Sequence, residues 1–560
     1  MSDTVTAVKA DPSTGTAATL DPITVSVIGS ALSTIVEEMS RVLVRAGYST
    51  SIKERKDVST AIMDADGLAL AQAAHQPVHL GSLLGITQEV LASCDPATIR
   101  PGDIFVGNDA YTGGGTHLND ITFIEPVFSD DRIVAWIANI AHHADFVDRS
   151  HQHIFQEGLR IPPVRLYREG KIQDDVLNMI LLNCQVPHER INDFRAQSAS
   201  NRFGRTRFLQ LIEKYGLPTV QAASRAVLDH TEARTRAGIR RLPDGVYRAE
   251  GLLDSGRYDP LVPLKVEITI AGDEIEMDFS GNPEQVRAPI NLTYMGLLVS
   301  AYFAIMVLVD PEVPPNAGFH RPIKVKADSG TIVCTAPPAA VYCRTDTSER
   351  LCDLIFSALA PACPERALAP CTGRGLLTLS GIDPRTGRFY VYNESMGGGE
   401  GAHMTMDGAD AVQIHVSNSH NIPVEVVEAE YPLQVESYSL VADSAGAGRW
   451  RSGLSYQRTI KVVGHEAKAA VAGNCFRDPG WGLDGGQPGA LGYRELSEGV
   501  EPFVNGRGTL RDGQTARLVT SGGSGVGDPA TRDRALVRRD LAEGKITQTA
   551  ARDVYGLSES

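Results

Sequence analysis

The chain has 560 residues, of which 42% are hydrophobic and 22% are charged, and its formal net charge at pH 7 is −15. The composition is that of an ordinary globular protein, but the length is too great for one hydrophobic core, so we expect two or three domains. The negative charge argues against nucleic acid or an anionic membrane as a partner. No apolar run in the sequence approaches the ~20 residues that cross a bilayer.

After a polar tail, the N-terminal part of the chain mixes helical and strand patterns. Residues 1–20 lack the basic start and apolar core of a secretory signal, so we expect a disordered tail on a cytoplasmic protein. Apolar residues at three- and four-residue steps predict a helix over residues 22–48, and alternation predicts a hairpin over residues 58–74. Further helices are expected at 82–93, at 174–215 as two or three segments, and at 220–241.

The composition changes near residue 245, where strand patterns begin to dominate. Alternating apolar residues predict strands over 247–279, and strand patterns resume from 376 to 521. Between them, an apolar run predicts a buried helix at 292–309, and a second helix is expected at 348–359. We therefore predict a mixed α+β, multi-domain protein. Its expected parts are the tail at 1–20, an N-terminal α/β metal-binding domain at 21–245, a β-rich domain with inserted helices at 246–520, and a glycine-rich loop with a helical tail at 521–560.

The end of the chain carries its own helix signal. Residues 521–527 are rich in glycine and lead into Asp528 and Pro529. Asp is a favoured N-cap residue and Pro is favoured at the first helical position. We expect Asp528 to cap a helix that extends over residues 530–544.

The eight cysteines are predicted to be structural. They contain no C-x-x-C pair, and five of them lie between Cys334 and Cys371 at gaps of eight to eleven residues. These gaps do not match zinc-ribbon spacing, and a large acidic chain does not depend on disulfides. We interpret the cysteines as reduced thiols that fill apolar space, with a redox or metal cluster as the alternative.

Residues 106–145 contain the side chains that are best suited to bind a metal. A glycine-rich loop at 108–120 leads into an apolar run, a turn at 129–131 and a second apolar run. Two such runs predict a hairpin, which returns the outer ends of both strands to the same end of a sheet. The side chains at those ends are His117, Asp120, His142, His143 and Asp145. Imidazoles and carboxylates together are typical ligands of a divalent metal.

Other interpretations of this stretch remain open. His117 could cap a loop, and His142 and His143 could be satisfied histidines at a strand end. The glycines at 113–115 allow the backbone to approach a small ligand closely, but the loop lacks the lysine and Ser/Thr of a P-loop. Asp57, at the start of a predicted strand, could also point at the metal site.

Several stretches carry a resemblance to a known family. They are SIKERKDVSTAI, AAHQPVHLGS, GGGTHLNDITF, EGLRIPPVRL, NIPVEVVEAEYPLQVESYSLVADSAGAGRWRSGL and GGSGVGDPATRD. In this order, over about residues 21–556, the chain resembles the B-type component of ATP-dependent hydantoinases and the equivalent half of 5-oxoprolinases. Similar proteins include lactam-hydrolysing enzymes such as caprolactamase and the biotin-independent acetone and acetophenone carboxylases.

The resemblance implies a division of the reaction between two chains with different roles. In this family an A-type component with an actin-like ATPase fold phosphorylates the substrate, and the B-type component holds a divalent metal at which the reaction is completed. ATP and magnesium would then bind the hydantoinase A-like partner, in an assembly with two copies of each chain. The present sequence fits this division because it has neither a P-loop nor a kinase glycine-rich loop with its lysine.

The resemblance also implies site residues. The family's metal-binding histidine, the aspartate three residues later and a histidine at the end of the next strand fall on His117, Asp120 and His142. These are the expected catalytic residues, acting through zinc or manganese, which suit imidazole and carboxylate ligands. Asp57 is the expected fourth ligand. Residues expected beside the metal ligands or the substrate are His143, Asp145, Asn108 and His79.

Three hypotheses about function follow. The first is the metal-containing component of an ATP-dependent cyclic amidase that opens a hydantoin, 5-oxoproline or lactam ring. The second is the corresponding component of a ketone carboxylase, and the third is a non-catalytic scaffold with a structural metal. Family members commonly continue with Gly-Gly and a Pro-Gly-Ser stretch after the position of Asp145, whereas residues 146–153 here are FVDRSHQH. This departure leaves the substrate open.

Overall fold

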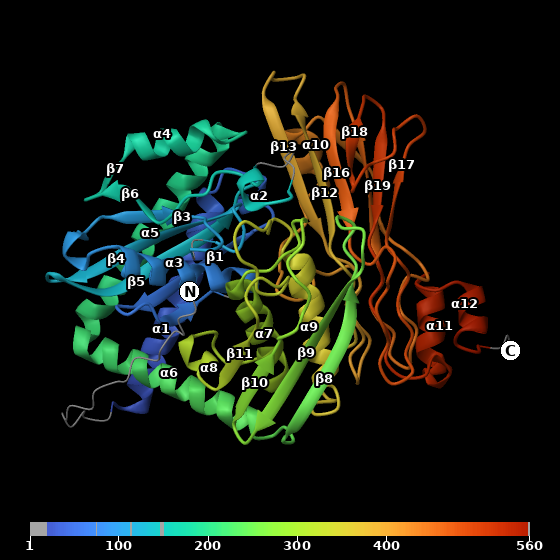
Figure 1. The fold of residues 1–560 in the computed structure, drawn as a ribbon, viewed down its shortest axis with the longest axis horizontal. Helices are drawn as coiled ribbons and strands as arrows, with labels where there is room; N and C mark the ends of the chain where they lie inside the picture. The colour runs from blue at the N-terminus through green and yellow to red at the C-terminus, as the bar shows by residue number, and fades with distance from the viewer. Residues whose placement is uncertain (1–19, 74, 113–114, 146–150, 558–560) are drawn as a thin grey trace.

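The fold is described by a computed structural model over residues 20–73, 75–112, 115–145 and 151–557 (Figure 1). Residues 1–19 of the tail predicted at 1–20, the glycines 113–114 and residues 146–150 lie outside these ranges. Three groups of sheets follow one another along the chain, each with its own apolar core. The predicted class, mixed α+β with several domains, is confirmed, whereas the boundaries at residues 245 and 520 stay predictions.

The first part is an antiparallel seven-stranded sheet with helices on both faces. Strand order is β2-β1-β5-β4-β3-β6-β7. Successive side chains of a strand point to opposite faces, so Ile137 packs under the helices α1, α5 and α6, while Trp136 and Ala138 pack against α3. The strands are β1 (Val58–Asp64), β2 (Ala69–Gln72), β3 (Ile104–Gly107), β4 (Asp120–Ser129), β5 (Arg132–His142), β6 (Val164–Arg168) and β7 (Lys171–Ile172). The helices are α1 (Pro22–Ala46), α2 (Thr50–Lys53), α3 (Leu80–Ser93), α4 (Asp174–Leu182), α5 (Pro187–Tyr215) and α6 (Leu217–Ile239).

The second part is a four-stranded sheet covered by two buried helices. One face of the sheet is apolar, as the alternating burial along β9 shows, and packs on α7 and α9 in one shared core. Helix α7 is apolar all round, and most of its residues are buried, whereas Tyr294 at its start is 43% exposed. The strands are β8 (Gly245–Leu253), β9 (Val262–Ala271), β10 (Glu274–Asp278) and β11 (Ile323–Lys326), and the helices are α7 (Tyr294–Val309), α8 (Ala317–His320) and α9 (Thr345–Leu359).

The third part is a sandwich of two four-stranded sheets, coloured orange to red in Figure 1. Inward side chains of both sheets form one core, which includes Leu379, Tyr392, Ile460 and Leu518. The strands are β12 (Gly375–Ile382), β13 (Phe389–Met396), β14 (Leu433–Leu440), β15 (Tyr456–Val462), β16 (Ala467–Gly473), β17 (Tyr493–Leu496), β18 (Arg507–Leu510) and β19 (Thr515–Val519), with α10 (Val424–Glu430) beside β14.

The helix predicted over residues 530–544 is present only over Arg534–Ala542, so its predicted start and its predicted cap are wrong. Asp528 caps only a short 3-10 turn, Pro529–Thr531, and the chain leaves helical geometry at Arg532. A second cap then starts a separate helix, because the Asp533 side chain accepts from the Ala535 amide at 2.8 Å. The C-terminal helices are α11 (Arg534–Ala542) and α12 (Gln548–Asp553). Within the described ranges, no helix is both long and apolar enough to cross a membrane.

The sandwich core gives a prediction about stability. Leu379 is fully buried in β12, so Leu379→Ala removes packed atoms and leaves a cavity. We expect a loss of about 2–5 kcal/mol in the free energy of unfolding, measured by chemical denaturation. Ile382, in the same strand, is 54% exposed. The matched variant Ile382→Ala should stay within about 0.5 kcal/mol of the wild type, and equal losses in both variants would contradict the assignment of the core.

Candidate metal centre

The end of the β4–β5 hairpin gathers three of the predicted metal-binding side chains. Asp120 begins β4 and His142 ends β5, and the two residues lie opposite each other in the antiparallel register. His117 precedes β4 and reaches the same place through a turn, in which the Asp120 amide donates to the His117 carbonyl at 3.2 Å. The predicted hairpin is therefore confirmed, and it brings residues 25 positions apart into contact.

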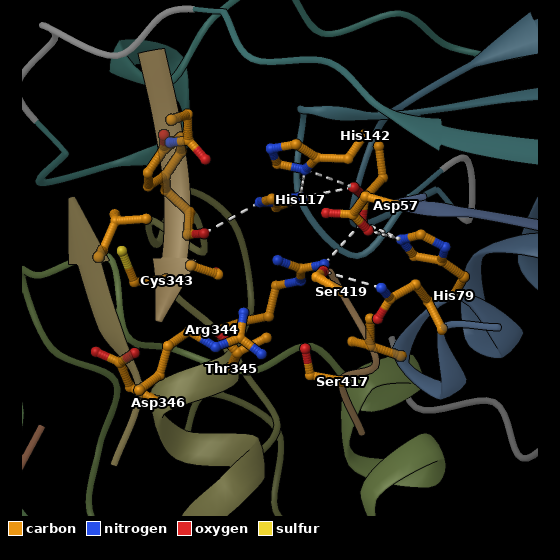
Figure 2. A pocket seen from close by; sticks show the side chains of 18 of the residues that line it. Asp57, His79, His117, His142, Cys343, Arg344, Thr345, Asp346, Ser417 and Ser419 are labelled. Carbon is orange, nitrogen blue, oxygen red and sulfur yellow. Dashed lines mark hydrogen bonds and ion pairs between the residues drawn. The ribbon is translucent and has the colours of Figure 1, made fainter. Parts of the chain in front are cut away.

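The donor atoms of these side chains converge. Asp120 Oδ1 lies 2.8 Å from His117 Nε2 and 3.1 Å from His142 Nδ1, and the two ring nitrogens are 3.3 Å apart. All three side chains are buried. The two rings stack with centroids 5.1 Å apart, and Figure 2 shows them side by side. One buried carboxylate oxygen thus faces two imidazole nitrogens.

The hydrogen bonding of His117 fits that of a metal ligand. His117 Nδ1 lies 3.0 Å from the Tyr342 carbonyl oxygen, which can only accept, so Nδ1 carries the proton. A neutral ring then presents the lone pair of Nε2 to Asp120 Oδ1. Two acceptors at 2.8 Å need a proton or a cation between them. Two imidazoles and a carboxylate, one imidazole held by a backbone carbonyl, form a donor set suited to zinc or manganese.

Arg344 holds the opposite side of the Asp120 carboxylate. Its Nη2 donates to Asp120 Oδ2 at 2.7 Å, and its Nε donates to the Thr116 hydroxyl at 2.7 Å. Burial raises the pKa of Asp120, but His117 and Arg344 outweigh this effect and hold the pKa well below its ordinary value. Burial, followed by the charge of Arg344, lowers the pKa of His117 to about 4. An ionised carboxylate and a neutral imidazole are the protonation states in which both groups bind metals.

Asp57 and His79 face the same centre from β1 and the start of α3. His79 Nε2 lies 3.5 Å from Asp57 Oδ1 and 3.7 Å from Asp120 Oδ2. Arg55 donates to Asp57 Oδ2 at 3.2 Å. Burial raises the pKa of Asp57, but His142, Arg55 and His79 together lower it below its ordinary value. Figure 2 shows Asp57 and His79 beside the two other histidines.

The remaining three predicted residues turn away from the centre. His143 follows His142 and points to the other side, where it contacts Arg190 and lies 3.1 Å from Gln197 Oε1. Asp145 accepts from the Gln185 amide, and Asn108 donates to the Leu118 carbonyl at 2.8 Å. These contacts fix the loop around His117, but none of the three side chains lines the cavity at the centre.

The centre opens into two adjoining cavities. The first, of about 60 Å³, is lined by His79, His117, Asp120, His142 and Asp57. The second, of about 200 Å³, shares Arg257, Tyr342, Cys343 and Leu376 with the first. Its charged wall consists of Arg257, Arg287 and Arg507, and no acidic side chain is among the described residues that line it.

Comparison with known proteins places the chain in a family. The sequence profile described as hydantoinase B/oxoprolinase matches residues 21–529. The chain belongs to the hydantoinase B/oxoprolinase family. The resemblance inferred from the sequence motifs is therefore confirmed.

Two relatives, one compared by sequence and one by structure, illustrate the likeness, and a further solved structure shares the fold. The chain is 31% identical to the B component of a putative D-/L-hydantoinase from Pseudomonas sp. strain NS671, over 96% of the chain and 95% of the relative. It is 28% identical to the ATP-dependent caprolactamase of Pseudomonas jessenii, with a TM-score of 0.86 and 97% coverage of both chains. A nucleotide-free acetone carboxylase superposes with a TM-score of 0.88 at 17% identity, over 96% of the chain and 80% of that protein. At that identity, the last comparison shows the fold alone.

In this family member, much of the site wall comes from residues that the sequence patterns did not reveal. Arg344, Asp346, Ser417 and Ser419 line the first cavity (Figure 2), and Asn393 lines it as well. Each lies more than 190 positions from the β4–β5 hairpin along the chain. Charged residues at the start of a helix are common on protein surfaces, so only the three-dimensional packing distinguishes Arg344 as part of a site.

Glu157 binds the backbone segment whose carbonyl contacts His117. Its Oε1 accepts from the amides of Val341 and Tyr342 at 2.9 and 2.7 Å. This contact orients the segment whose Tyr342 carbonyl binds His117. Burial raises the pKa of Glu157 to about 8, so the folded chain favours the protonated side chain at neutral pH.

Glu157 gives a prediction about pH. Its pKa in the folded chain, about 8, lies above the ordinary value of 4.5. The folded state therefore binds the proton more tightly, and the stability that this group contributes below pH 4.5 declines as the pH rises toward 8. Glu157→Gln does not titrate, so the wild type should lose stability relative to this variant across that window. Thermal unfolding at a series of pH values measures the difference.

The matched control for this measurement is Glu267→Gln, at a half-exposed position in β9. The Glu267 variant should follow the wild type across the same pH window. Parallel profiles for the wild type and Glu157→Gln would contradict a raised pKa of Glu157.

Proposed function

We propose that this chain is the metal-containing component of an ATP-dependent cyclic amidase. Its substrate is a hydantoin, 5-oxoproline or lactam ring, whose amide is phosphorylated by an A-type ATPase partner, with two copies of each chain in the complex. The observation that carries the proposal is the convergence of His117, Asp120 and His142 beside an arginine-walled cavity. The family, and its members named as a hydantoinase component and an ATP-dependent caprolactamase, support it.

The chemistry requires an activated nucleophile at a poorly reactive carbonyl. An unstrained cyclic amide resists water, because the nitrogen lone pair is delocalised into the carbonyl, and phosphorylation of the carbonyl oxygen creates a good leaving group. His117, Asp120 and His142 are proposed to hold zinc or manganese. Such an ion polarises a carbonyl or phosphoryl oxygen and lowers the pKa of water toward neutrality.

Each side chain of the centre has a definite task in this proposal. The Tyr342 carbonyl orients His117, and Arg344 orients Asp120. His79 Nε2, 3.5 Å from the Asp57 carboxylate, is the group placed to accept the proton of the attacking water. The arginines of the second cavity attract the phosphorylated, anionic intermediate and hold it beside the metal ligands.

The proposal predicts which variants lose ring opening. His117→Ala and Asp120→Asn remove a metal ligand, so both should lose metal and reduce ring opening at least about 10³-fold, while some ATP hydrolysis at the partner continues. The assay combines the reconstituted complex with ATP, zinc or manganese, and hydantoin, 5-oxoproline or caprolactam, and quantifies the opened product. His230→Ala, at an exposed position of α6, is the control that should retain activity and metal.

The same assay separates the alternatives. An amidase uses water and should not need bicarbonate, and this chain alone should hydrolyse no ATP. Bicarbonate-dependent consumption of a ketone, without ring opening of any cyclic amide, would instead assign the chain to the carboxylases. Full ring opening by His117→Ala would leave the metal with a structural role only.

Arg344 gives a second prediction. It touches Asp120 rather than the substrate, so Arg344→Ala should weaken metal affinity or lower kcat by about 10–100-fold through a misplaced Asp120 carboxylate. Metal titration of the purified chain separates this positioning role from a general loss of structure, and Arg344→Lys should restore part of the affinity. Arg248→Ala, at a position 67% exposed in β8, serves as the control. Unchanged metal affinity together with unchanged kcat in Arg344→Ala would contradict the assigned role.

A further inference from the structure

A second cluster of metal-binding side chains lies outside the centre described above. Asp353, Cys371 and His415 are buried, and one donor atom from each lies within 4.8 Å of the other two. Asp353 is on α9, Cys371 lies between α9 and β12, and His415 lies between β13 and α10. Three separate segments thus bring a carboxylate, a thiol and an imidazole together.

Asp353 accepts hydrogen bonds through both carboxylate oxygens, and Arg350 donates to its Oδ2 at 3.3 Å. His415 Nε2 donates to Asp353 Oδ1 at 2.8 Å, and the Cys371 amide donates to the same oxygen at 3.0 Å. The Gly401 amide donates to Cys371 Sγ at 3.2 Å. Phe356 and Phe303 pack against the His415 ring with centroids 5.2 and 6.0 Å away, so the cluster has an apolar border.

The location of the cluster argues against a role in catalysis or in disulfide formation. Neither of the two cavities at the metal centre is lined by Asp353, Cys371 or His415 in the described part of the chain. Cys371 is a free cysteine. Side chains that do not line those cavities cannot contact a substrate bound there. Binding of a metal ion is therefore the remaining chemical role for Asp353, Cys371 and His415.

We propose that Asp353, Cys371 and His415 form a second divalent-metal site, of the zinc class. A soft thiolate combined with imidazole and carboxylate selects zinc over magnesium or calcium. Binding would release the thiol proton of Cys371 and the proton shared by His415 and Asp353 to solvent, and a water would complete the shell. The competing state is the metal-free network, in which the proton stays between His415 and Asp353.

Helix α9 connects this site with the first one. Arg344 is the N-cap residue of α9 and binds Asp120, and Asp353 lies nine residues later on the same helix. At 1.5 Å per residue, the two sites are about 13 Å apart along the helix axis. A metal at the second site would fix α9 to the segments that carry Cys371 and His415, and so hold Arg344 in place. This proposal does not depend on the proposed amidase activity.

Elemental analysis of the purified full chain after extensive dialysis tests the proposal. The wild type should hold about two metal equivalents, and Cys371→Ser and His117→Ala should each lose about one of them. Cys363→Ser is the matched control, because this half-buried thiol donates to the Leu308 carbonyl and has no part in the cluster. The control should retain both equivalents.

Cobalt substitution provides a measurement that does not depend on any variant folding correctly. Only the second site contains a thiolate, so the cobalt-loaded wild type should show a thiolate-to-cobalt charge-transfer band in the near ultraviolet. His117→Ala should keep this band and Cys371→Ser should lose it. A single equivalent that disappears in His117→Ala, with no near-ultraviolet band in the wild type, overturns the second site while leaving the first intact. A wild type that holds one equivalent and shows the band, both of which persist in His117→Ala, would instead support the second site and count against the proposed amidase function.

Discussion

The structure of the site depends on one buried ion pair, between Asp120 and Arg344. Asp120 is fully buried at the end of the hairpin, and Arg344 is the cap residue of a helix more than 220 positions later. A carboxylate without a partner in such a place costs several kcal/mol, so the pair has to form when the first sheet meets α9. The contact leaves one carboxylate oxygen bound to the guanidinium and the other free to face the two imidazoles. The ion pair therefore decides which atom of Asp120 is available for a metal.

Because of this ion pair, the site is built from two parts of the chain. The proposed ligands of the first metal site all come from residues 57–142, but the groups that orient them come from residues 342–344. Arg55 continues the connection into the sandwich, because its Nη1 donates to Asn393 Oδ1 at 2.9 Å. An isolated segment 21–245 would leave Asp120 without Arg344 and His117 without the Tyr342 carbonyl, so it would not reproduce the centre.

Patterns in the sequence predicted the helices and strands whose formation depends on residues close to one another in the chain. The hairpin β4–β5, the amphipathic α1 and the apolar α7 follow from side-chain periodicity, and the hairpin alone brought His117, Asp120 and His142 together. The position of His143 also follows from strand periodicity. A period of two sends consecutive residues to opposite faces, so His142 and His143 could not both face the metal.

Partners distant in sequence could not be found in this way. Nothing near Arg344 in the sequence marks its contact with Asp120, because the pair depends on how two sheets and a helix pack. The same applies to Cys371, which lies among cysteines whose spacing matches no metal motif and which meets Asp353 and His415 only in the fold. The late start of the helix predicted over residues 530–544 has a local cause, since Asp533 rather than Asp528 caps the helix.

The charge of the two cavities is opposite to that of the whole chain. The chain has a net charge of −15, yet six arginines line the two cavities against three aspartates. The arginines are Arg55, Arg257, Arg287, Arg344, Arg374 and Arg507, and the aspartates are Asp57, Asp120 and Asp346. Two of these arginines, Arg55 and Arg344, are buried, and low-dielectric walls strengthen the field of the charged side chains at the cavity. Such a field stabilises an anion more than a neutral ring, so it favours the phosphorylated intermediate over the unreacted amide. In the proposed reaction, this difference would draw the activated species toward the metal ligands while the neutral ring gains little from the same arginines.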